Sequence, residues 1–243
     1  MNANEVADFL AQYPDVTTIE LLISDLNGVL RGKRIERDLL EKVYSSGFYL
    51  PGSVMSLDST GTTIEEAGLG VDQGDRDFLC RPIPGTLAIV PWIESGDRAQ
   101  VLCTMYADDG TGFFADPRHR LLSAVERFNK LGFDTGFAAE LEFYLVDLER
   151  NAKGQIQPPT SANNQRRMTS CQVYSIDDLS EYDYFITDVV QTARLQNIPA
   201  DTVIAEYAPG QCEVNLDYGE NIVTAIDQAI LLKRVIRNVA KKH

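Results

Sequence analysis

The pattern of hydrophobic and polar residues in the first hundred positions predicts a small domain of mixed helices and strands. Residues 17–23 are an apolar, β-branched run, an Asp-Leu-Asn-Gly turn follows at residues 25–28, and a second short run extends over residues 29–35. Two such runs around a short turn predict a β-hairpin. Helical spacing follows at residues 37–46, and Gly47 marks the expected end of that helix.

The rest of this part adds one helix, a long loop and further strands. Residues 6–10 have helical spacing, and residues 87–92 and 99–106 have strand-like patterns. Residues 51–81 are rich in turn residues, and their glycines do not follow the spacing of a dinucleotide-binding motif, so we expect a long loop there. These elements predict an α+β domain over residues 1–110.

A polar, glycine-bearing break at residues 107–112 predicts a boundary, with a second domain over residues 111–243. The second domain is expected to open with a helix in which Asp116 is the N-cap and Pro117 the first helical residue. The apolar stripe of this helix, which we expect to be buried, comprises Leu121, Leu122, Val125 and Phe128.

The later part of this domain alternates between helices, loops and short strands. Residues 151–169 are polar and contain a Pro-Pro pair, which predicts a loop. Residues 179–195 have helical spacing, and an amphipathic helix with apolar positions from residue 222 to residue 239 is expected to end at His243. A short strand is expected at residues 202–205.

Two glutamates interrupt an otherwise apolar run at residues 138–146. In a strand, Glu140 and Glu142 would share a face, with side-chain roots roughly 6.5–7 Å apart. Burying two like charges that close is costly unless cations neutralise them, so the pattern indicates metal ligation. A half-exposed strand with two glutamates on its polar face is an equally simple interpretation.

A second pair of glutamates flanks a turn further along the chain. Glu206 follows a short strand, a Pro-Gly turn reverses the chain, and Glu213 lies on the returning strand. With Glu142 they would supply three hard oxygen ligands, which suit Mg²⁺ or Mn²⁺. A surface hairpin with unrelated acids is the alternative.

Composition narrows the classes of function. The 243 residues carry 36 acids and 22 bases, a net charge of -14, which argues against a nucleic-acid partner because phosphate binding needs clustered Lys and Arg. Four widely spaced cysteines indicate reduced thiols, with neither a zinc knuckle nor a disulfide scaffold. No signal peptide or membrane-spanning run is evident, so we expect a cytoplasmic protein without a membrane partner.

The two glutamate motifs together resemble those of the glutamine synthetase family. The strand Glu140-Leu141-Glu142-Phe143 is similar to the family's E-x-E-F motif, and residues 206–213 (Glu-Tyr-Ala-Pro-Gly-Gln-Cys-Glu) are similar to its E-x-A-P-G-Q-x-E hairpin. Supporting matches run in family order at residues 25–33, 80–92 and 116–118. The form of these motifs looks most like the γ-glutamylpolyamine synthetase branch.

The resemblance implies a fold and a reaction. It implies a β-grasp N-terminal domain and the first part of a catalytic domain with a curved antiparallel sheet. The implied reaction is ATP-dependent: glutamate and an amine, either a polyamine or ammonia, form a γ-glutamyl amide through γ-glutamyl phosphate. It also implies a homo-oligomer of stacked hexameric rings, a dodecamer, for the complete protein.

The resemblance further assigns residue roles. Glu142, Glu206 and Glu213 would hold one Mg²⁺ or Mn²⁺, Glu140 would contribute to a second ion at the ATP phosphates, and Glu206 would also act on the amine. Asp58 resembles the N-domain aspartate that reaches the active site of a neighbouring subunit. Tyr174 lies where the family often has a substrate-lining aromatic residue, although a core or surface tyrosine is an equal alternative.

Part of the family pattern is absent from residues 1–243. The family continues into a glycine-rich glutamate-binding loop, a histidine metal ligand and later arginines, and His243 does not match that histidine motif. We therefore expect residues 1–243 to be a truncated portion that neither completes the second metal site nor ligates alone. The alternatives are a catalytically silent relative that acts as a structural or regulatory oligomer, and a simple calcium- or manganese-binding module.

Overall fold

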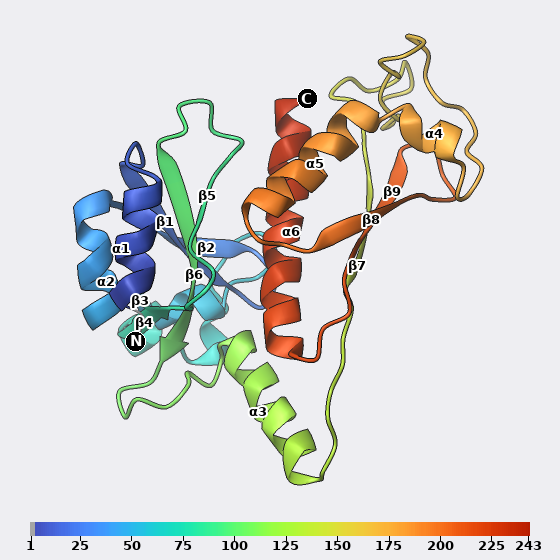
Figure 1. Ribbon diagram of the computed structural model, residues 1–243. Coiled ribbons are helices and arrows are strands. Elements are labelled where there is room, and N and C mark those ends of the chain that lie inside the picture. The colour runs from blue at the N-terminus through green and yellow to red at the C-terminus, as the bar shows by residue number, and fades with distance from the viewer. Residues whose placement is uncertain (1–2) are drawn as a thin grey trace. The chain divides into compact units, whose positions relative to one another are not determined.

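The computed structural model describes residues 3–243 and divides the chain into two compact units, Met1–Thr135 and Gly136–His243. Helices and strands are mixed in both units (Figure 1). Within the described residues, no helix is both long enough and apolar enough to cross a membrane.

The N-terminal unit is built on a six-stranded sheet. Its strands lie in the order β2 (Leu30–Glu36), β1 (Thr18–Ser24), β6 (Arg98–Tyr106), β4 (Asp77–Pro82) and β3 (Phe48–Pro51), and β5 (Ala88–Ile89) also pairs with β6. The central pair β1 and β6 is parallel, whereas every other pairing is antiparallel. The expected hairpin is confirmed as β1 and β2.

Two helices complete the core of this unit. Helix α1 (Ala3–Gln12) and helix α2 (Leu40–Ser46) contribute buried apolar side chains to one cluster with the sheet. The buried side chains of this cluster include Val6, Phe9, Ile19, Leu21, Leu40, Val43 and Val101. The sheet thus buries its helix-facing side against α1 and α2.

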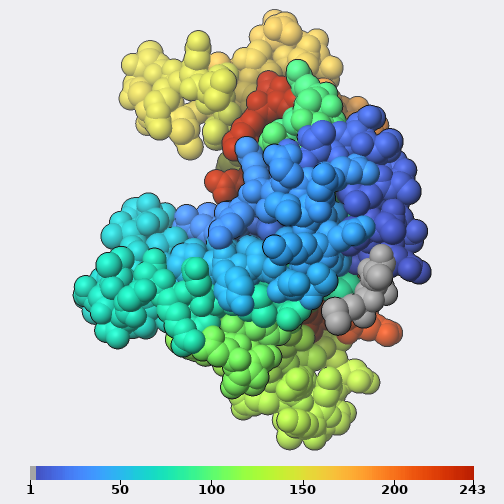
Figure 2. All heavy atoms as spheres, turned by 90° about the vertical axis from the view of Figure 1, so that its left-hand side faces the viewer, coloured from blue at the N-terminus to red at the C-terminus, as the bar shows by residue number. Residues whose placement is uncertain are grey.

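Two predictions for this unit were wrong in extent. The segment at residues 51–81 is not entirely loop, because its last part forms β4, which pairs with both β3 and β6. The strand expected at residues 87–92 is reduced to the two residues of β5. The segment between β3 and β4 contains short 3-10 helices and one isolated antiparallel bridge between Leu57 and Thr63, and it projects from the surface of the unit (Figure 2).

Helix α3 (Pro117–Lys130) begins as the sequence predicts but is not buried as expected. Asp116 caps it, accepting a hydrogen bond from the Arg118 amide at 2.8 Å. No side chain of α3 is buried, and Phe128 is 52% exposed. The prediction of a buried stripe is therefore wrong for this chain, because periodicity identifies the apolar face of a helix and not whether another element covers it.

The second unit contains a three-stranded antiparallel sheet and three helices. Strand β9 (Gln211–Leu216) lies between β7 (Glu140–Tyr144) and β8 (Ala200–Ala205). The helices are α4 (Ile176–Ser180), α5 (Asp183–Leu195) and α6 (Ile222–Lys242). The single helix expected at residues 179–195 was wrong at its start, because Ser175 caps a separate short helix α4 and α5 begins only at Asp183.

Alternation along the strands gives this sheet one polar and one apolar face. Phe143 lies on the apolar face, and its ring packs edge-on against Phe185 of α5 with centroids 6.0 Å apart. Val214 and Leu216 of β9 point the same way and are buried. Packing of this face leaves the opposite face free for polar side chains.

Candidate metal centre

Strand register brings the glutamates of the two sequence motifs to one place. Glu142 on β7 is directly opposite Glu213 on β9, and Glu213 is directly opposite Ile204 on β8. Glu206 lies two residues beyond Ile204, so its side chain is on the same face as both other carboxylates. The Glu206 amide continues this pairing by donating to the Gln211 carbonyl at 3.0 Å.

The three carboxylates converge closely. One carboxylate oxygen from each of Glu142, Glu206 and Glu213 lies within 4.8 Å of the other two. An octahedral Mg²⁺ with metal–oxygen distances of 2.0–2.1 Å holds opposite ligand oxygens about 4.2 Å apart, so this spacing suits such an ion after small side-chain rotations. Three oxygen donors without nitrogen or sulfur also favour a hard cation.

Burial and mutual repulsion mark this cluster as unfavourable without a cation. Glu206 and Glu213 are 7% and 9% exposed, whereas Glu142 is exposed. Loss of solvent around Glu206 raises the pKa of its carboxyl, and the negative charges of Glu213 and Glu142 raise it further. A divalent cation would remove both penalties, because it neutralises the charge that burial disfavours.

The side chain of Gln211 holds one of the three carboxylates. Its amide nitrogen donates to Oε2 of Glu142 at 2.9 Å, while its amide oxygen accepts from the Tyr144 hydroxyl and the Ala208 amide, each at 3.2 Å. Gln211 belongs to the hairpin motif at residues 206–213, but the sequence alone predicted no role for it. Strand alternation is the signal that could have found it, since Gln211 and Glu213 are two residues apart on β9 and share the polar face.

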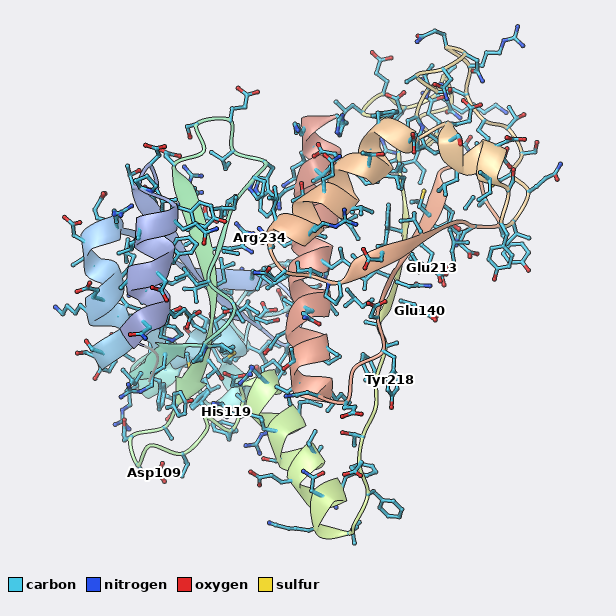
Figure 3. The ribbon with its side chains drawn as sticks, viewed as in Figure 1. Asp109, His119, Glu140, Glu213, Tyr218 and Arg234 are labelled. Carbon is cyan, nitrogen blue, oxygen red and sulfur yellow. The ribbon has the colours of Figure 1, made fainter. Side chains whose placement is uncertain are left out.

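Glu140 lies beside this cluster but is not part of it. It is exposed on β7, opposite Asn215 of β9, and shares the polar face with Glu142 two residues away. Figure 3 shows Glu140 and Glu213 on the neighbouring strands of this sheet. Among residues 3–243, the group close enough to share a metal ion comprises only the other three glutamates.

Asp58 is found in the N-terminal unit. Its half-buried carboxylate accepts hydrogen bonds from the Thr60 hydroxyl and amide and from the Thr62 amide, at 2.7–2.9 Å. These bonds, with the Thr60 hydroxyl foremost, lower the pKa of Asp58. The carboxylate is therefore held ionised by its own loop.

Tyr174 and His243 occupy different surroundings in the second unit. Tyr174 is 68% exposed with a left-handed backbone (φ 64°), and its amide donates to the carbonyl of Ala205, the residue before Glu206. His243 ends α6, where its Nε2 lies 3.0 Å from Asp188. The histidine thus has a carboxylate partner of its own, outside the glutamate cluster.

Comparison with known proteins places these features in a family. The model of the family described as glutamine synthetase, catalytic domain, matches residues 114–243, more than half of the chain. The gamma-glutamylputrescine synthetase of Escherichia coli (strain K12) is 40% identical over 240 residues, which are 98% of this chain and 50% of that protein. A glutamate–isopropylamine ligase of a Pseudomonas species is 30% identical over 98% of this chain and 51% of its own length.

Solved structures support the same fold. A crystal structure described as a novel glutamine synthase homolog superposes with a TM-score of 0.75 at 23% identity, covering 93% of this chain and 49% of that one. The chain spans about half the length of the curated relatives that it matches. From the family match over residues 114–243, together with the two glutamate motifs, the chain belongs to the glutamine synthetase family.

Proposed function

We propose that the protein is an ATP-dependent carboxylate–amine ligase that joins glutamate to an amine. The observation that carries this proposal is the convergence of Glu142, Glu206 and Glu213 within 4.8 Å on one face of the sheet, in a member of this family. Mg²⁺ or Mn²⁺ is the proposed cofactor, held by these three carboxylates, with Glu140 directed to a second ion and ATP as co-substrate.

The proposed reaction has two steps. The γ-carboxylate of glutamate attacks the γ-phosphate of ATP to give γ-glutamyl phosphate and ADP, and an amine then displaces phosphate to give the γ-glutamyl amide. The bound cations would neutralise crowded phosphate and carboxylate oxygens and favour in-line attack. This chain's glutamates would hold those cations.

Glu206 is the residue we assign to the amine step. An amine attacks only after losing a proton from its ammonium form, and a carboxylate beside it can accept that proton. Glu206 lies in the E-x-A-P-G-Q-x-E motif, where the family resemblance puts a carboxylate near the amine. Asp58 is proposed to assist from a neighbouring subunit.

The class of amine is proposed from the named relatives. The protein at 40% identity acts, by its name, on putrescine, and the protein at 30% identity acts on isopropylamine. Glutamine synthetases, such as that of Thermotoga maritima, are 28% identical. We therefore propose a polyamine as acceptor, with ammonia as the alternative.

We also propose a finer description of the fold. Residues 1–110 are assigned as a β-grasp domain, supported by their central parallel pair β1 and β6 flanked by antiparallel strands. The boundary near residue 110 is supported by the start of the catalytic-domain match at residue 114. Residues 111–243 would form the first part of that domain, and the complete protein would be a homo-oligomer of hexameric rings.

The proposal is tested with protein expressed from the complete open reading frame. Phosphate release is measured with ATP, glutamate, Mg²⁺ and one amine at a time: ammonium, putrescine, ethanolamine or an aromatic amine. We expect release that requires both glutamate and amine and is fastest with putrescine. Glu213→Gln should abolish it, whereas Glu149→Gln, an exposed acid in the same unit, should not.

Two results would contradict the proposal. ATP binding without glutamate-dependent phosphate release, for every amine, would favour a catalytically silent relative. Saturable metal binding without any ATP affinity would favour a simple metal-binding module.

A further inference from the structure

We infer that Gln211 is a positioning residue that fixes the orientation of the Glu142 carboxylate for cation binding. The inference rests on the proposed function, because it concerns the same three-glutamate cluster. Glu142 is its exposed member, and an exposed glutamate samples several rotamers unless another group holds it. The hydrogen bond from Gln211 to Oε2 supplies that restraint and leaves Oε1 available to a cation.

The hydrogen-bond network fixes which end of the Gln211 amide faces Glu142. The two ends of a glutamine amide are distinguished only by their partners. The Ala208 backbone N–H can only donate, so the Gln211 atom beside it must be the oxygen. The Tyr144 hydroxyl donates to the same oxygen, and the nitrogen is thereby directed at Glu142.

This arrangement links three separate parts of the site. Gln211 is the first residue of β9, Tyr144 and Glu142 are on β7, and Ala208 is in the turn that follows Glu206. One neutral side chain therefore ties the β8–β9 turn to the strand that carries a ligand. Neighbours that orient metal ligands in this way typically change metal affinity 10–100-fold when they are mutated.

A double-mutant cycle on Mn²⁺ affinity tests the inference. Mn²⁺ binding to the full chain is followed by loss of the electron paramagnetic resonance signal of the free ion. We expect Gln211→Met, which keeps the side-chain length but cannot donate, to weaken binding at least 10-fold in the wild-type background. In a Glu142→Gln background the same substitution should weaken binding less than 3-fold, since the carboxylate that it orients is already gone.

Tyr144→Phe provides a second variant that keeps the test valid if Gln211→Met does not fold. Tyr144 is 59% exposed, so losing its hydroxyl should leave the fold intact while releasing one restraint on Gln211. We expect a smaller weakening of Mn²⁺ binding, about 2–5-fold, that is also lost in the Glu142→Gln background. Tyr207→Phe, an exposed tyrosine in the same hairpin, is the matched control and should not change affinity.

The outcomes separate this inference from the proposed function. Equal weakening by Gln211→Met in both backgrounds, or none in either, would overturn the positioning role while leaving the metal site intact. Absence of saturable Mn²⁺ binding by the wild-type chain would overturn both together.

Discussion

Replacing Asp116 with alanine is expected to destabilise the N-terminal unit by about 3–7 kcal/mol. The carboxylate is 2% exposed and accepts three hydrogen bonds, from the Thr104 hydroxyl at 2.7 Å and from the Met105 and Arg118 amides at 2.8 Å. It therefore joins strand β6 to the first turn of α3.

The expected loss of stability is the sum of the costs of removing the acceptor from each of the three donors. Thr104 and Met105 are buried, so each would keep an unsatisfied donor at a cost of about 1–3 kcal/mol. Loss of the helix cap at Arg118 adds about 1 kcal/mol. Asp116→Asn retains one acceptor oxygen and is itself a good cap, so we expect a smaller loss of about 1–2 kcal/mol.

The assay is urea unfolding followed by tryptophan fluorescence. Trp92 is the only tryptophan and belongs to the same unit as Asp116, so its signal reports this unit's unfolding. Asp109→Ala is the matched control, because Asp109 also accepts two hydrogen bonds but lies in an exposed turn. Its midpoint should stay close to that of the wild type.

Either of two results would contradict this expectation, provided that the dependence of the unfolding free energy on urea concentration is unchanged. A loss below about 1 kcal/mol for Asp116→Ala would mean that the buried donors find other partners. Equal losses for the alanine and asparagine variants would mean that the acceptor oxygen is not the source of the stabilisation.

Three further predictions concern backbone space, core packing and pH. Gly32→Ala should destabilise the N-terminal unit severely, because an added Cβ would lie 1.7 Å from the Leu21 carbonyl oxygen on the paired strand. Urea unfolding followed by tryptophan fluorescence measures this, and an unfolding midpoint equal to that of the wild type would contradict it. Leu232→Ala should lower the free energy of unfolding of the second unit by about 2–5 kcal/mol, because the Leu232 side chain on α6 is fully buried. Unfolding followed by circular dichroism measures this loss, and a loss under about 1 kcal/mol would argue against the packing described. Mn²⁺ affinity should fall as the pH is lowered through the raised pKa of Glu206, because protons then compete with the cation for the carboxylate. This competition should begin at a higher pH than for a glutamate with an ordinary pKa. Mn²⁺ titrations that show constant affinity across this pH range would refute the prediction.

Elements with strong local signals were predictable from sequence. The turn at residues 25–28 fixed the first hairpin, and Asp116 with Pro117 fixed the start of α3. The two glutamate motifs indicated which carboxylates would meet, because strand alternation and a Pro-Gly reversal are local properties. The site's three-glutamate composition was therefore accessible without coordinates.

Features that depend on distant partners were not accessible in this way. Strand β4 contains Asp77, Arg81 and Pro82 and has little strand character of its own, and it forms because β3 and β6 lie on either side to pair with it. Periodicity could not show that α3 stays uncovered within its unit. The hydrogen bond from Gln211 to Glu142 joins residues 69 positions apart and depends on the strand register.

The sheet of the second unit has one polar and one apolar face, so its strand register determines both the packing of the core and the position of the carboxylates. Removing one residue from the β8–β9 turn, so that β9 slips by one position, would turn Glu213 towards the helices and bring Cys212 and Val214 to the face of Glu142. Such a slip would bury a carboxylate and expose apolar side chains at the same time. Selection for a stable core therefore also selects for correctly placed carboxylates, and an insertion or deletion in this hairpin would damage folding and chemistry together.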